Sequence, residues 1–325
     1  MSVNNIAILS SGTDNSGING AIRAAVRTAI SSNVKIYGVK RGYLGLIDND
    51  MSVLLSHDVS GKIGKAGCFL GTAKTRNLLT DENVEKAVKN CQSKNINGLV
   101  VIGGLGSLIA SKKFIEKGIK VIGIPSTIQD NVPGTDIALG VDSAINNITE
   151  CLDKIRASTS STNRVFLVQV EGRECGSLAV HAGLTSGADF VLIPERPTQD
   201  LSEISKKMTE LNLKGKNQCL AVIAAGWKPG IDELAKFLEN HVSETDLSVR
   251  TTVLGYVQRG GSPSGFDRLL GTEMGSMAVK ELIQGNSGKM IAFQNNSFVS
   301  VPFEECLTRP KEIDQRLIDL FNFTQ

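Results

Sequence analysis

The chain has 325 residues, a formal net charge of +2 and a mean hydropathy near zero. That length allows one large or two ordinary globular domains. The small net charge provides no global field for nucleic acid, so anion binding depends on local clusters of cations. No apolar stretch reaches the length of about 18 residues that a membrane-spanning helix needs, which excludes a membrane protein of that kind.

Six cysteines are scattered along the chain without a Cys-x-x-Cys pair. This pattern is typical of reduced thiols and argues against a disulfide framework or a zinc site. The first five residues, Met-Ser-Val-Asn-Asn, lack the basic and apolar regions of a secretory signal. We therefore expect a cytoplasmic protein.

Short apolar runs alternate with helical patterns along the chain. We expect strands at residues 6–10, 34–39, 98–103, 120–124, 164–171, 190–194, 219–224, 250–255 and 289–293. We expect helices at about 17–31, 81–93, 106–117, 141–157, 176–185, 200–211, 231–240 and 265–284. This alternation predicts βαβ units in an α/β fold with mostly parallel sheets and helices on both faces.

Three polar or glycine-rich turns, at residues 10–17, 103–107 and 125–131, follow predicted strands. Ligands bind beyond the carboxyl ends of strands in such sheets, and glycines let backbone N–H groups face a phosphate. Any one of the three could be a tight turn without a ligand. Together they favour a phosphate-binding cleft.

These turns lie among distinctive motifs, which are Gly42-Tyr43-Leu44-Gly45, Gly134-Thr135-Asp136, Gly172-Arg173, Cys175-Gly176, Pro194-Glu195, Val253-Leu254-Gly255 and Gln258-Arg259-Gly260-Gly261-Ser262-Pro263. With them the chain resembles the bacterial-type ATP-dependent 6-phosphofructokinases over almost its whole length. The resemblance implies a cleft between two lobes. The larger, nucleotide-type lobe would comprise residues 1–138 and 253–303, and the smaller, sugar-phosphate lobe residues 139–252 and 304–325.

The resemblance also shows where carboxylates are missing. The family's aspartate that helps hold the magnesium of Mg²⁺-ATP aligns with Leu105, and leucine cannot bind a hard cation. The family's base for the sugar hydroxyl aligns with Gln129, and a second aspartate near the metal aligns with Asn131. A neutral amide can hold a hydroxyl group but cannot take its proton. We therefore expect no intact catalytic site and no certain cofactor.

Other family positions have also changed. An acid that binds sugar hydroxyls aligns with Gly226, a sugar-site histidine with Tyr256, and a loop glycine with Thr13. A phosphate-bridging arginine aligns with Lys74, which keeps the charge but not the bidentate geometry. The resemblance leaves a residual nucleotide site at Gly12, Tyr43, Lys74, Gly104 and Ser107.

Loss of a general base alone costs roughly 10²–10⁴-fold in rate, or about 3–5 kcal/mol of barrier. The predicted self-contained kinase activity is therefore very poor. One alternative is that Asp130 or water replaces the base. A pyrophosphate-using kinase fits less well, because such relatives keep the aspartates and usually carry lysine where this chain has Ser126.

Phosphate-binding cations are retained. The resemblance implies that fructose 6-phosphate would contact Thr127, Arg164, Arg173, Arg250, Tyr256 and Arg259. In family tetramers the equivalents of Arg164 and Arg250 reach into a neighbour's active site. The chain could therefore lend two arginines to a catalytically competent partner. The alternative is that these arginines form ordinary surface ion pairs.

Most of the family's effector site is also retained. Arg23 and Arg27 lie four residues apart on one predicted helix face, where like charges repel unless an anion lies between them. The family positions that hold ADP or phosphoenolpyruvate align with Arg23, Arg27, Arg156, Asp189, Lys214 and Lys216, while a further family arginine is Ser56 here.

Three hypotheses follow. The first is a catalytically impaired regulatory subunit of the fructose 6-phosphate phosphorylation step, which binds an effector and pairs with a catalytic paralogue. The second is an active kinase, for this or another sugar phosphate, with an altered site. The third is a stand-alone sensor of a phosphorylated metabolite that forms a homo-oligomer.

Overall fold

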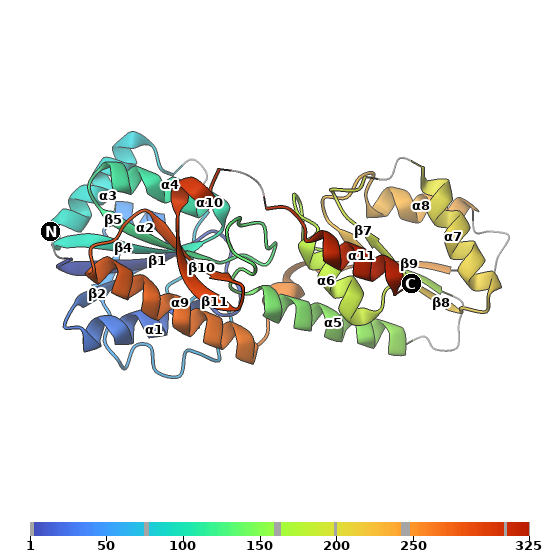
Figure 1. The fold of residues 1–325 in the computed structure, drawn as a ribbon, viewed down its shortest axis with the longest axis horizontal. Helices are drawn as coiled ribbons and strands as arrows, with labels where there is room; N and C mark the ends of the chain where they lie inside the picture. Colours follow the sequence, from blue (N-terminus) through green and yellow to red (C-terminus); the bar gives the residue numbers. More distant parts are fainter. Residues whose placement is uncertain are drawn as a thin grey trace. The chain divides into compact units, whose positions relative to one another are not determined.

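The computed structural model describes residues 3–74, 78–158, 164–197, 200–241, 248–308 and 311–324 (Figure 1). Internal contacts divide the chain into two compact units. Unit 1 comprises Met1–Ser143 and Arg259–Lys311, and unit 2 comprises Ala144–Gln258 and Glu312–Gln325. The chain therefore crosses between the units after Ser143, after Gln258 and after Lys311. The expected lobe boundaries, after residues 138, 252 and 303, precede these crossings by a few residues.

Unit 1 contains a seven-stranded sheet with the order β11-β10-β5-β4-β1-β2-β3. Its five inner strands pair in parallel, whereas the outer pairs β10–β11 and β2–β3 are antiparallel. The strands are β1 (Asn5–Ser11), β2 (Lys35–Val39), β3 (Met51–Val53), β4 (Ile96–Gly103), β5 (Lys120–Pro125), β10 (Lys289–Gln294) and β11 (Ser297–Pro302).

Helices cover both faces of this sheet. Successive residues of β1 alternate between two apolar clusters, as the two-residue period of a strand requires. Ile6 and Ile8 belong to the cluster with α1 (Ile18–Ser31) and α9 (Gly265–Ile283). Ala7 and Leu9 belong to the opposite cluster, which is covered by α2 (Tyr43–Asp48), α3 (Asp81–Ser93), α4 (Leu105–Glu116) and α10 (Phe303–Cys306).

Unit 2 contains a four-stranded, all-parallel sheet with the order β7-β8-β6-β9. Its strands are β6 (Arg164–Val170), β7 (Phe190–Leu192), β8 (Gln218–Ala224) and β9 (Ser248–Val253). Helices α7 (Leu201–Leu213) and α8 (Ile231–His241) share one apolar cluster with these strands. Helix α11 (Gln315–Phe323) packs against α6 (Ser177–Ser186), as Figure 1 shows.

The α/β fold with mostly parallel sheets is confirmed, and each expected strand and helix is present with small shifts at its ends. The crossing after Ser143 lies inside α5 (Val141–Ala157). Prediction from the sequence missed β3, β11, α2, α10, α11 and the 3₁₀ turn η1 (Gly255–Arg259). Within the described residues, no helix is both long and apolar enough to cross a membrane.

Candidate functional site

The three predicted turns of unit 1 lie at neighbouring positions, because β1, β4 and β5 are adjacent in the sheet. Hydrogen bonds join them directly. The hydroxyl of Ser107, after β4, donates to the Ser11 carbonyl oxygen at 3.2 Å. The amide of Asn15, after β1, donates to the Ser126 hydroxyl, after β5, at 3.0 Å. The turns therefore form one polar surface at the carboxyl end of the sheet.

The first turn is open at its tip. Thr13 is exposed, and Gly12 has a φ of 101°, which favours glycine. The Gly12 N–H donates to the Ala73 carbonyl oxygen at 3.1 Å, so the predicted nucleotide contact would have to use another amide of this turn. Lys74, the next residue after Ala73, is exposed.

The second turn opens α4 and has an apolar residue at the expected metal position. Leu105 is partly buried against the cluster that contains Tyr43 and Phe114. Tyr43 is 1% exposed, stacks on Phe114 and donates its hydroxyl to the Ser107 carbonyl oxygen at 2.8 Å, and burial raises its pKa. Tyr43 therefore supports the turn from inside, and its ring does not face a ligand.

A magnesium ion does not fit this donor set. Hard cations need several oxygen ligands, and Leu105 supplies none. Among the described residues, no group of three or more His, Cys, Asp or Glu side chains is placed to hold a metal. Leu105 therefore supplies no ligand at the metal position that the resemblance implies.

The third turn holds the two amides that replace aspartates. The side chains of Gln129 and Asn131 are partly exposed, whereas Thr127 is 9% exposed. The Gln129 N–H donates to the Thr127 hydroxyl oxygen at 3.1 Å, which fixes the bend of this segment. Both amides can donate and accept hydrogen bonds, but neither can accept a proton.

Asp130 lies between these amides and is 2% exposed. One carboxylate oxygen accepts from the Ala138 N–H at 3.0 Å, and the other pairs with the Lys311 ammonium group at 2.6 Å. Both carboxylate oxygens of Asp130 are therefore engaged by groups of the protein itself. The geometry therefore argues against the hypothesis that Asp130 replaces the missing base.

In unit 2, backbone atoms lie close to Gly226, the residue that the resemblance aligns with a sugar-binding acid. A Cβ atom on Gly226 would lie 1.9 Å from the Arg173 carbonyl oxygen. The Gly226 N–H also donates to the Gly172 carbonyl oxygen at 2.8 Å. The segment that carries Arg173 thus packs directly against residue 226, and no side chain fits there without moving it.

The retained arginines are distributed over both units. Arg164 begins β6 and is partly buried, whereas Arg250 and Arg173 are exposed. Tyr256 is 85% exposed on η1, close in sequence to Arg250. Arg259 is the first residue of unit 1 after the chain leaves unit 2. It therefore belongs to a different unit from Arg164, Arg173, Arg250 and Tyr256, which are also predicted to contact fructose 6-phosphate.

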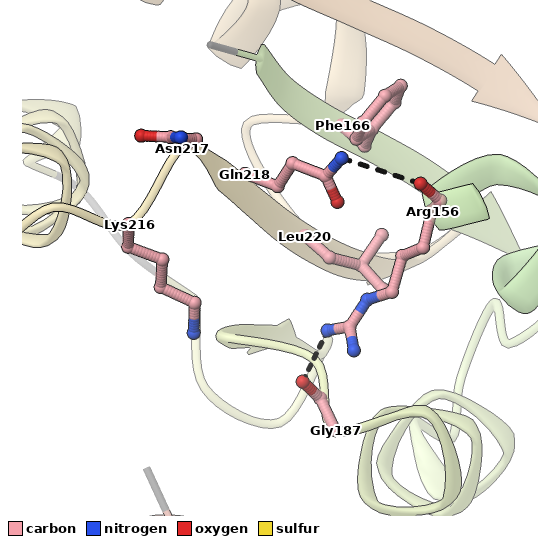
Figure 2. A pocket seen from close by; sticks show the side chains of 7 residues that line it. All are labelled: Arg156, Phe166, Gly187, Lys216, Asn217, Gln218 and Leu220. Carbon is pink, nitrogen blue, oxygen red and sulfur yellow. Dashed lines mark hydrogen bonds between the residues drawn. The ribbon is translucent and has the colours of Figure 1, made fainter. Parts of the chain in front are cut away.

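Unit 2 also contains a pocket of about 340 Å³ with a cationic lining (Figure 2). The Arg156 guanidinium donates to the Gly187 carbonyl oxygen at 2.5 Å. Figure 2 shows the charged ends of Arg156 and Lys216 directed toward the space between them. The remaining lining residues, which the sequence did not reveal, are Phe166, Asn217, Gln218 and Leu220.

Asp189 contacts two of the residues that line this pocket, Lys216 and Leu220. Its side chain is 4% exposed, accepts from the Leu220 N–H at 2.8 Å and forms an ion pair with Lys216. Burial is the main reason that the pKa of the neighbouring Cys219 is raised, and Asp189 raises it further. Because both oxygens of Asp189 are used inside the protein, this carboxylate is a poor candidate for the predicted contact with an effector's metal ion.

The structure thus brings together three of the six predicted effector residues, Arg156, Asp189 and Lys216. Lys214 is exposed at the end of α7. Arg23 and Arg27 lie on α1 in unit 1, where Arg23 is partly buried and Arg27 exposed. Arg23 and Arg27 therefore belong to a different unit from Arg156, Asp189 and Lys216.

Comparison with known proteins accounts for these features. A sequence profile described as Phosphofructokinase matches residues 5–282. The chain is 41% identical over 305 residues to the ATP-dependent 6-phosphofructokinase of Staphylococcus epidermidis, covering 92% of each protein. It is 39% identical over 315 residues to that of Bacillus subtilis, covering 97% of each.

A solved structure of phosphofructokinase from Saccharomyces cerevisiae has the same fold, with a TM-score of 0.85 and 30% sequence identity. The match covers 94% of this chain and 45% of the yeast chain. The present chain therefore spans about half the length of that relative.

Proposed function

Since this chain belongs to the phosphofructokinase family, we propose that it is a catalytically impaired regulatory subunit or paralogue in the fructose 6-phosphate phosphorylation step of glycolysis. The observation that carries this proposal is an asymmetry between two sets of residues. Groups for proton transfer, metal binding and sugar-hydroxyl recognition are replaced at Leu105, Gln129, Asn131 and Gly226, whereas phosphate-binding cations remain.

Two features of the geometry support this proposal. Asp130 is tied to Lys311, so no alternative carboxylate in the third turn is available as a base. The carbonyl oxygen of Arg173 takes the space that a side chain at residue 226 would need. A missing base costs roughly 10²–10⁴-fold, and a missing metal ligand adds several kcal/mol of lost charge stabilisation.

The cationic pocket of unit 2 supports effector binding. Arg156 and Lys216 offer a guanidinium and an ammonium group to a phosphate or carboxylate. Because Asp189 is bound to Lys216 and Leu220, it favours a metal-free phosphorylated acid, such as phosphoenolpyruvate, over a magnesium–ADP complex.

The partner we propose is a catalytic paralogue, to which Arg164 and Arg250 would be donated across an interface. Purified chain alone should turn over fructose 6-phosphate with Mg²⁺-ATP at least ~10³-fold more slowly than an intact kinase. Ordinary kinase rates would contradict the proposal. Mixing with the paralogue should change its activity and produce a complex of larger mass, and Arg250→Ala should weaken the change.

A second candidate is a stand-alone sensor that forms a homo-oligomer, and the pocket around Arg156 favours it because effector binding needs no catalytic site. Thermal shift with phosphoenolpyruvate and ADP tests binding in either case. Binding without any association with a catalytic paralogue would favour the sensor. Turnover of another sugar phosphate would instead favour an altered kinase.

A further inference from the structure

Lys311 is the last residue of unit 1 before the chain enters unit 2. Its ammonium group donates to an Asp130 carboxylate oxygen at 2.6 Å and to the Asp136 carbonyl oxygen at 2.8 Å. The two side chains are 16% and 3% exposed, so the pair is largely shielded from water. Lys311 therefore fixes the loop between β5 and α5, residues 126–140, to the point where the chain leaves unit 1.

This loop is held in a conformation that depends on Asp130. The φ of Asp130 is 52°, a value that aspartate and asparagine tolerate better than most residues. The second Asp130 oxygen accepts from Ala138 N–H, and Leu139 N–H bonds back to Pro125 carbonyl oxygen at 3.0 Å. The ion pair thus lies at the centre of a closed loop that also carries Thr127 and Gln129.

The same chain is anchored again a few residues later. Asp314 accepts from the Arg316 N–H at 2.9 Å and begins α11, which packs against α6 in unit 2 (Figure 1). Phe321 of α11 is buried, and its ring lies within 3.5 Å of a Cβ atom built on Gly183 of α6. Helix α6 in turn follows the Arg173 segment that fills the space at residue 226.

Very little chain separates the two anchors. From Lys311 to Asp314 there are three peptide steps, which span at most about 10 Å when extended. We propose that residues 311–314 act as a strap that couples the loop between β5 and α5 to α11 and α6. Opening of the loop releases Lys311 and removes the restraint on α11, and loosening of α11 weakens the hold on the loop.

A buried pair suits this role better than an exposed one. Separation of the partners leaves a buried charge without a counter-charge, so partly separated states of the pair are disfavoured. The strap requires neither the proposed effector nor a catalytic partner, so its failure would leave the proposed function untouched.

Hydrogen exchange of the full chain, followed by mass spectrometry, tests the strap. In Asp130→Asn, which keeps the tolerated backbone conformation and leaves Lys311 able to hydrate, we expect at least 10-fold faster exchange in residues 126–140. We expect a similar increase in residues 177–186 and 315–323. Lys113→Met, which breaks an exposed pair with Asp81, should change none of these segments.

The reverse direction gives a second, independent measurement. Phe321→Ala should speed exchange in residues 126–140, and the added effect should vanish in the Asp130→Asn background because the strap is already released. Lys311→Met should reproduce the Asp130→Asn pattern. Changes confined to the mutated unit, or strictly additive changes in the double variant, would overturn the proposal and leave the ion pair with a local role only.

Discussion

The turns at the sheet edge of unit 1 and the cationic pocket of unit 2 use their charged groups in opposite ways. In the turns, the carboxylate of Asp130 is engaged by Lys311 inside the protein. In the pocket, Asp189 is likewise consumed, but it holds Lys216 in place beside Arg156 at an open pocket. Internal pairing thus engages a carboxylate in one region and holds a lysine at a pocket in the other.

The difference lies in the surroundings of the two ion pairs, since the Lys311 side chain is 16% exposed and the Lys216 side chain 46% exposed. Three substitutions and one change of metal ion test this contrast.

Substitution of Gly226 should have the largest effect, because the space for a side chain is occupied by the Arg173 carbonyl oxygen. Gly226→Ala should lower the free energy of unfolding by about 3 kcal/mol or more. Chemical denaturation measures it. Gly265→Ala is the control, since among the described residues nothing lies within 4 Å of a Cβ atom there. An unchanged free energy of unfolding in Gly226→Ala would show that residue 226 has room for a side chain.

Removal of Arg156 should mainly affect the pocket. Arg156→Ala deletes a charged donor that faces the ligand, and charge-assisted hydrogen bonds are worth about 1.5–3 kcal/mol. Phosphoenolpyruvate should therefore bind about 10–100-fold more weakly by calorimetry. Lys214→Ala, at an exposed position, should have a smaller effect. Equal losses in both variants would indicate a diffuse electrostatic effect and no defined pocket.

Asp267 gives a pH dependence to unit 1. It is fully buried and accepts from the Gly140 N–H at 2.7 Å and the Ser143 N–H at 2.8 Å. Burial raises its pKa above the ordinary 3.8, against the opposing effect of Ser143 and Gly140.

The folded state therefore holds the Asp267 proton more tightly than the unfolded state does. The stabilisation is present below pH 3.8 and is lost as the pH rises through the higher folded pKa. Asp267→Asn should be less stable overall but should lack this decline, which denaturation curves at several pH values would reveal. If the free energy of unfolding changed with pH in the same way in both proteins, the assignment of this pH dependence to Asp267 would be wrong.

Magnesium should have the smallest effect. Because Leu105 offers no oxygen and Asp189 is already bound, adding Mg²⁺ or EDTA should not change the thermal shift produced by phosphoenolpyruvate. A shift that requires Mg²⁺ would show that one of the two regions still binds a metal–ligand complex. Calcium offers a matched control for non-specific ionic effects.

Much of the fold was accessible from local patterns. The alternation of Ile6 and Ile8 with Ala7 and Leu9 suits a strand buried on both faces, and such runs predicted the inner strands well. Strand β11 was missed because its residues are only partly buried at a sheet edge, which leaves a weak apolar signal. The three turns were expected together because adjacent parallel strands end at one edge.

The site itself was predicted less completely, for a physical reason. Resemblance identified Gln129, Asn131 and Leu105 as replacements, since these differences can be read directly. The pairing of Asp130 with Lys311 joins residues far apart in the chain, and neither residue's neighbours signal the other. The same holds for Gly226 and the Arg173 carbonyl oxygen, and for the burial of Tyr43, which only three-dimensional packing determines.

The contact between Gly226 and the Arg173 carbonyl oxygen also bears on descent. A mutation that introduced any side chain at residue 226 would meet a backbone atom and would be selected against. The neighbouring segment would have to retreat beforehand, with no benefit of its own. The order in which mutations can accumulate at these two positions is thereby constrained.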